Sequence, residues 1–228
     1  ALNGDLTSAA DGTVAIGYQA LTALTSGAQN TAIGFLAADL ITTGNFNTII
    51  GYEAFTSAAT DDAGNTAVGA QALYSQNGSG TTANTAIGTE ASLNNVTGTN
   101  NTYVGYRSGK GGTGSNSNNT AVGKDALYAI TTGERNVAVG TNALTALTAG
   151  GTANLGNVAI GYGALDNLQT GMSNIAIGVA AMDAATGAVS NCVVIGDRAG
   201  DAINNTDANG TVAIGHSALT ALTSGAGN

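Results

Sequence analysis

The chain has 228 residues and a formal net charge of −9, and its five lysines and arginines are too few for the basic stripe that nucleic-acid binding requires. Hydrophobic residues make up 43% against 8% charged, which excludes a disordered tail, while 35 glycines, no proline and 4% aromatic residues exclude ordinary globular usage. No apolar run approaches the roughly 20 residues that span a bilayer, so we expect no membrane insertion by this segment.

A short phrase, Asn-Thr-Ala-Ile-Gly followed by a variable residue, recurs along the whole chain at spacings of 17–21 residues. Such a period is too short for a helical repeat and predicts an all-β fold, a parallel β-solenoid of about 12 coils, as one repeat array over residues 1–228. The glycines at the centres of the coils are Gly17, Gly34, Gly51, Gly69, Gly88, Gly105, Gly123, Gly140, Gly161, Gly178, Gly196 and Gly215.

Each phrase begins with a position that is asparagine in nine coils. Stacked coils would align these amides, so we expect a ladder in which each asparagine bonds to corner backbone and to its neighbour. The nine are Asn30, Asn47, Asn65, Asn84, Asn101, Asn119, Asn136, Asn157 and Asn174, and Thr13, Cys192 and Thr211 take the position elsewhere.

A short strand is predicted directly before each glycine. Residues one and three before it are β-branched in every copy, as Ile33 and Thr31 are, and we interpret them as the inward face. The residue between them is alanine in nine copies, including Ala15 and Ala32, and is expected to face outward. A flat apolar strip of this kind predicts self-association, as a homotrimer or a filament, with the homotrimer favoured.

After the glycine, which permits a tight corner, we expect a shorter second strand and a turn. Its apolar positions are represented by Ala20, Leu21 and Leu24. The variable residue next to the glycine is aromatic in five coils and is a candidate for contact with a host-surface glycan or protein. The five are Tyr18, Phe35, Tyr52, Tyr106 and Tyr162.

No catalytic residues, metal ligands or cofactors are predicted, and the chain is not expected to be an enzyme. Charged residues are scattered over positions expected to be outward, such as Asp125 and Asp183, and the single His216 is expected to be exposed. Cys192 is either a buried small side chain or a thiol that pairs between chains. The stretch from Gly109 to Asn119 is interpreted as a surface turn.

The residues Gly17-Tyr18-Gln19-Ala20-Leu21 and Asn30-Thr31-Ala32-Ile33-Gly34 resemble the head repeats of YadA-type trimeric autotransporter adhesins. Longer-period versions of the repeat in fibre-like proteins of phages and giant viruses are similar as well. The resemblance extends over all twelve coils and implies a left-handed β-roll in a trimeric, extracellular fibre on a cell surface or virion.

The expected function is therefore a structural fibre or adhesin segment that mediates surface attachment. Residues 12–30 and 210–228 match at 16 of 19 positions, so we expect a segment of a longer array. One alternative is an ice-binding solenoid, suggested by the threonines Thr31, Thr48, Thr66, Thr85, Thr102 and Thr120, although the predicted inward face would bury them. A polysaccharide-degrading solenoid is a further alternative, for which the sequence shows no clustered acidic site.

Overall fold

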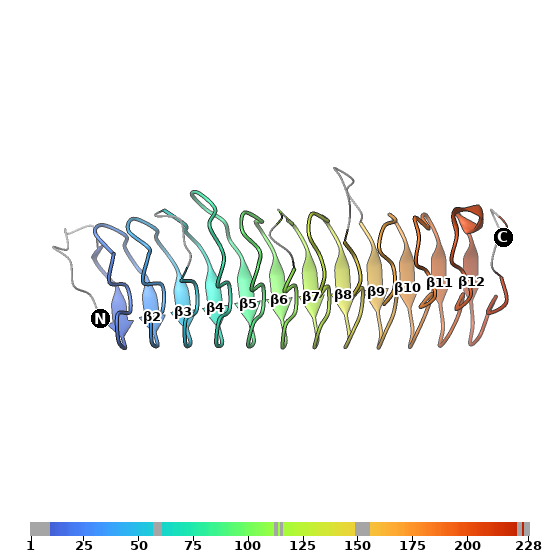
Figure 1. Cartoon of the computed structure of the whole chain (residues 1–228), viewed down its shortest axis with the longest axis horizontal. Coiled ribbons are helices and arrows are strands. Elements are labelled where there is room, and N and C mark those ends of the chain that lie inside the picture. Colours follow the sequence, from blue (N-terminus) through green and yellow to red (C-terminus); the bar gives the residue numbers. More distant parts are fainter. Residues whose placement is uncertain are drawn as a thin grey trace. The chain divides into compact units, whose positions relative to one another are not determined.

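The structure is a computed structural model that describes residues 10–56, 61–111, 114, 116–148, 156–222 and 225. It divides into two compact units, Ala1–Asn116 and Ser117–Asn228, and the repeat runs through both. Within each unit, short parallel strands stand side by side, one for each coil (Figure 1). The predicted all-β parallel solenoid is thus confirmed.

The six strands of the first unit pair in parallel, each with the next along the chain. Their register keeps equal positions of the phrase opposite one another, as Ala15 lies opposite Ala32. The strands are β1 (Val14–Ile16), β2 (Thr31–Ile33), β3 (Thr48–Ile50), β4 (Thr66–Val68), β5 (Thr85–Ile87) and β6 (Thr102–Val104).

The second unit repeats this arrangement with the same register, and a short 3-10 helix, η2 (Thr206–Ala208), precedes its last strand. Its strands are β7 (Thr120–Val122), β8 (Val137–Val139), β9 (Val158–Ile160), β10 (Ile175–Ile177), β11 (Val193–Ile195) and β12 (Val212–Ile214).

The predicted inward and outward faces of the strands are wrong. In β2 the central Ala32 is fully buried, whereas Thr31 and Ile33 are partly exposed, and the other strands follow this pattern except β1, whose Ala15 is only partly buried. The residue directly before the strand explains this orientation. Asn30 shares a face with Ala32 because strand side chains alternate, and the buried asparagine ladder fixes that face inward. Alanine therefore faces the core, and the β-branched pair faces out.

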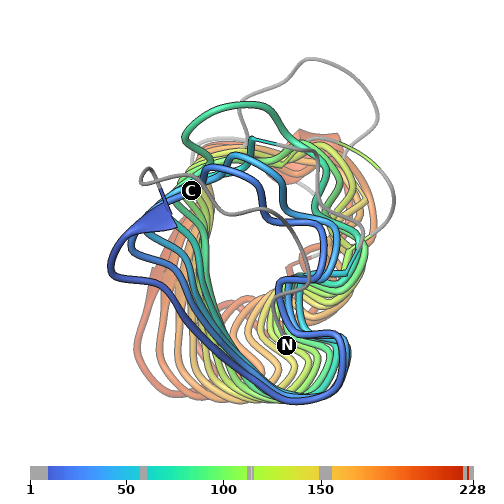
Figure 2. The same ribbon diagram turned by 90° about the vertical axis from the view of Figure 1, so that its left-hand side faces the viewer.

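The predicted second strand after the glycine is also wrong. Gln19 and Leu21 have φ angles of 53° and 52°, and most coils repeat these left-handed values two and four residues after the glycine. Such residues form turns and cannot continue an extended strand. The coils still bond in register there, as Leu21 N–H donates to the Ala37 carbonyl at 3.1 Å. Seen end-on, successive coils of each unit follow nearly the same path (Figure 2).

The corner glycines are required by close approach of neighbouring coils. Gly34 has a φ of +144°, and a Cβ placed on it would overlap the carbonyl oxygen of Gly51 in the next coil. An L-residue would meet both the unfavourable φ and this carbonyl. The corner therefore keeps the backbones of adjacent coils close enough for the hydrogen bond from Gly51 N–H to Ile33 O, at 2.8 Å.

Core volume is balanced inside the coil of β6. Where most strands have a central alanine, β6 has Tyr103, which is fully buried and donates its hydroxyl to Asn116 Oδ1 at 2.7 Å. Gly109 faces this ring, at a position where coils such as that of Ala121 have a leucine, Leu127. The stretch expected to be a surface turn thus contributes Gly109 and Asn116 to the core, while residues 112, 113 and 115 lie outside the described residues.

Candidate interaction surface

The outer face of the first unit is a regular grid of two columns. One column is threonine in five of six strands and begins with Val14; the other is wholly isoleucine or valine. The grid consists of Val14, Thr31, Thr48, Thr66, Thr85 and Thr102 beside Ile16, Ile33, Ile50, Val68, Ile87 and Val104. None of these side chains is buried, so the threonines expected inside lie on the surface.

The outer face of the second unit has the same geometry but different chemistry. Only its first strand supplies a threonine, and every other position is aliphatic. The grid consists of Thr120, Val137, Val158, Ile175, Val193 and Val212 beside Val122, Val139, Ile160, Ile177, Ile195 and Ile214, none of them buried. This face is a nearly continuous hydrocarbon strip.

The asparagines form a hydrogen-bonded ladder inside each unit. The Oδ1 of Asn30 accepts from both the backbone N–H and the Nδ2 of Asn47 at 3.0 Å, and Asn47 Nδ2 also donates to the Asp62 carbonyl at 2.9 Å. Asn136 bonds to Asn119 in the same way in the second unit. Because these buried amides are paired, the ladder fixes the register of the coils rather than offering a binding group.

Cys192 takes the ladder position in the coil of β11 and is fully buried. Its N–H donates to Asn174 Oδ1 at 3.1 Å, and its Sγ lies 3.3 Å from the Ala208 carbonyl. Burial raises the pKa of the thiol above its usual value. The buried alternative is therefore the correct one, and pairing between chains through this thiol is contradicted by its position inside the coil.

The aromatic residues next to the corner glycines are all exposed. Tyr18, Phe35 and Tyr52 stack on three successive coils, with ring centroids 5.2 and 5.4 Å apart and planes within 13°. The guanidinium of Arg107 lies 4.8 Å from the Tyr106 ring centroid. Tyr162 stands in the second unit. The sequence pattern predicted these five side chains as contact candidates, but it did not predict that three of them form one stack.

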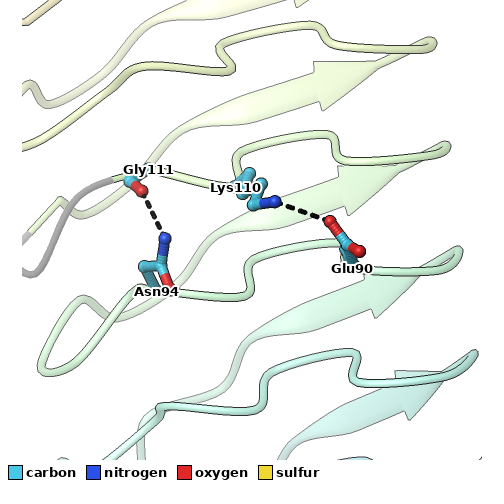
Figure 3. A network of polar contacts seen from close by, with 4 residues as sticks. All are labelled: Glu90, Asn94, Lys110 and Gly111. Atoms are coloured by element: carbon cyan, nitrogen blue, oxygen red, sulfur yellow. Dashed lines mark hydrogen bonds and ion pairs between the residues drawn. The ribbon is translucent and has the colours of Figure 1, made fainter.

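Charged residues lie beside the turns. Lys110 reaches Glu90 of the preceding coil at 2.6 Å, and Asn94 Nδ2 donates to the Gly111 carbonyl at 3.0 Å (Figure 3). His216 is exposed, as predicted. Asp125 was predicted to face outward but is buried, and its Oδ2 lies 3.0 Å from Lys124 Nζ. Burial, together with the charges of Asp166 and Asp201, raises the pKa of Asp183.

In the part of the chain that the structure describes, no cluster of three or more His, Cys, Asp or Glu side chains could hold a metal ion. Among the same residues, no helix has both the length and the apolar character needed to cross a membrane. Comparisons with protein-family models, curated proteins and solved structures find no match. Any functional inference therefore depends on the surfaces that the chain itself presents.

Proposed function

We propose that the chain is a structural fibre or adhesin segment that acts outside the cell, self-associates as a homotrimer and carries contact residues for surface attachment. The observation that supports this most is the outer face of the second unit, where aliphatic side chains fill eleven of twelve positions of a regular strip and none of them is buried. Hydrocarbon arranged in this way gains free energy when it is removed from water.

The size of the strip suits assembly along its length. Six strands about 4.8 Å apart, each three residues of about 3.3 Å, give a flat area of roughly 290 Å² for one unit. This is less than the roughly 800 Å² per partner of a standard interface, so association should depend on how many coils are in register. A strip only one strand wide can be buried around a threefold axis, where each chain contacts two neighbours.

Sedimentation velocity over a range of protein concentrations tests the assembly. We expect the mass to rise from that of one chain, 22.0 kDa, toward that of three chains as concentration increases. A species that stays at 22.0 kDa at every concentration would contradict self-association, and a limiting mass of two chains would replace the trimer with a dimer.

A second candidate function is ice binding, and the orientation of the threonines in the first unit favours it. Five threonine hydroxyl and methyl groups repeat about every 4.8 Å beside a column of aliphatic side chains about 6.6 Å away. A flat, repeating array of this kind can order water over its surface. Thermal hysteresis that disappears in a Thr66→Tyr variant would support this function, and no hysteresis in the unchanged protein would exclude it.

A further inference from the structure

The aromatic column of the first unit is interrupted above Tyr52. The residues after the next corner glycines are Ala70, Thr89 and then Tyr106. Backbone bonds keep these coils in register: Gln71 N–H donates to Tyr52 O at 2.8 Å, Glu90 N–H to Ala70 O at 2.9 Å, and Arg107 N–H to Thr89 O at 3.0 Å. The four residues therefore stand in one line, and the two middle ones are small.

The next residue in the column, Ala70, has no ring to stack on the second face of Tyr52. Phe35 covers the other face, with centroids 5.4 Å apart and planes 9° apart. Tyr52 is 52% exposed, compared with 42% for Phe35, which has a ring on each side. Three coil steps of about 4.8 Å separate Tyr52 from Tyr106. After about 4 Å is subtracted for ring thickness, roughly 10 Å of column remains above Tyr52.

Polar groups border this opening. Glu53 Oε2 accepts from Gln71 Nε2 at 2.9 Å, and a hydrogen bond from the Tyr52 hydroxyl to Glu53 raises the pKa of that tyrosine. The carboxylate of Glu90 is engaged by Lys110 from the following coil (Figure 3). An open aromatic face thus lies next to a carboxylate and an amide that are held in place by each other.

We propose that the open face of Tyr52, with Ala70 and Thr89 beneath the opening and Glu53 and Gln71 at its side, binds a neutral sugar residue of a glycan. The C–H face of a pyranose can pack on the ring, while its hydroxyl groups bond to the carboxylate and the amide. This inference rests on the attachment role in the proposed function and names its ligand.

Two features of the site determine which sugar it accepts. The ring of Tyr52 is already held by stacking on Phe35, so little side-chain freedom is lost on binding. Glu53 beside the opening, in a chain with a net charge of −9, repels acidic sugars. The site therefore favours a neutral pyranose over a sialylated or sulfated one.

Two variants remove the site in opposite ways, and a third is a matched control. Tyr52→Ala deletes the ring, whereas Ala70→Tyr adds a ring that continues the stack and covers the open face. Tyr162→Ala deletes an aromatic residue that also follows a corner glycine and is 59% exposed, but is followed by Gly163 and so lacks the flanking polar pair.

Saturation-transfer NMR with cellohexaose, N-acetylchitohexaose and sialyllactose tests the site on the full chain. We expect transfer to the ring C–H groups of at least one neutral probe, at least tenfold weaker binding in both Tyr52→Ala and Ala70→Tyr, and unchanged binding in Tyr162→Ala. No transfer to either neutral probe, equal binding by Tyr52→Ala, or stronger binding of sialyllactose would overturn the proposal.

Sedimentation of the same variants separates this inference from the proposed assembly. Tyr52 lies at the corner and not on the strand face, so Tyr52→Ala should associate as the unchanged protein does. Sugar binding by a chain that remains a monomer would leave this site in place and contradict the fibre. Assembly without sugar binding would contradict the sugar site and leave the proposed fibre in place.

Discussion

The two units share one backbone repeat but present different side chains to the outside. The outer face of the first unit has threonine at five of its twelve positions, and this unit has eight of the ten aromatic residues of the chain, including the stack that ends at Tyr52. The outer face of the second unit is almost entirely aliphatic. Different stretches of one solenoid can therefore present surfaces of different chemistry without a change in the backbone fold.

The cores of the two units also differ in the residue that packs against a glycine. In the first unit, Tyr103 is balanced by Gly109; in the second, Val194 is balanced by Gly200, on which a Cβ would lie 3.1 Å from Val194 Cγ1. Both pairs replace the alanine and leucine that six of the twelve coils have, but the tyrosine is much the larger residue. In these two coils a larger central residue is matched by a glycine, and the cost of breaking the pair should depend on the residue that opposes the glycine.

Leucine in place of these glycines should have the largest effect on stability. Gly109→Leu would collide with the Tyr103 ring and cost about 3 kcal/mol, because overpacked cores distort, whereas Gly200→Leu should cost about 1–2 kcal/mol. Thermal unfolding followed by circular dichroism measures both. The double variant Tyr103→Ala/Gly109→Leu restores the usual pair and should recover more than half of the loss, and no recovery would refute the volume balance.

Exchanging the outer faces should have the next largest effect, on association. The triple variant Val137→Thr/Val158→Thr/Ile175→Thr makes one column of the second unit mostly threonine, as in the first unit. It adds three hydroxyl groups to a strip proposed to be buried. At about 0.7 kcal/mol each, they should weaken association roughly thirtyfold.

Sedimentation equilibrium measures this change. The matched control, Thr48→Val/Thr66→Val/Thr85→Val in the first unit, should not weaken association. If the second-unit variant associates as tightly as the unchanged protein, the aliphatic strip is not the interface.

Much of the fold was predictable because the repeat constrains it directly. The glycine spacing gave the number of coils, and the asparagine positions gave the ladder. The direction of the strand faces was predicted incorrectly, because β-branched Thr31 and Ile33 suit a buried face as well as an exposed one. Asn30, two residues before Ala32, held the missing information, since a stacked amide needs partners inside the coil.

Other features depend on contacts that one sequence does not reveal. The aromatic stack was not predicted, because adjacency of Tyr18, Phe35 and Tyr52 requires the exact register of three coils. The left-handed turn at Leu21 was missed for a different reason. Leucine rarely adopts a positive φ, and here the hydrogen bond to Ala37 and burial of the side chain select it.

The smallest expected effect concerns the carboxylates beside the turns. Burial raises the pKa of Asp39 in the first unit and of Asp183 in the second, and Asp183 is raised further by Asp166 and Asp201. A raised pKa in the folded state means that these groups favour folding below the unfolded value of 3.8 and lose that contribution as the pH rises through the folded value. Both carboxylates therefore oppose folding at pH 7.

Asp183→Asn should accordingly stabilise the protein at pH 7 by about 0.5 kcal/mol, a small value because the side chain is largely screened by solvent. The gain should shrink as the pH falls toward 3.8, since the unchanged Asp183 becomes protonated there. Thermal unfolding of both proteins across this pH range measures the gain, with Asp197→Asn, at an exposed carboxylate, as the control. A difference that does not vary with pH would assign the gain to packing and would contradict a contribution from the charges of Asp166 and Asp201.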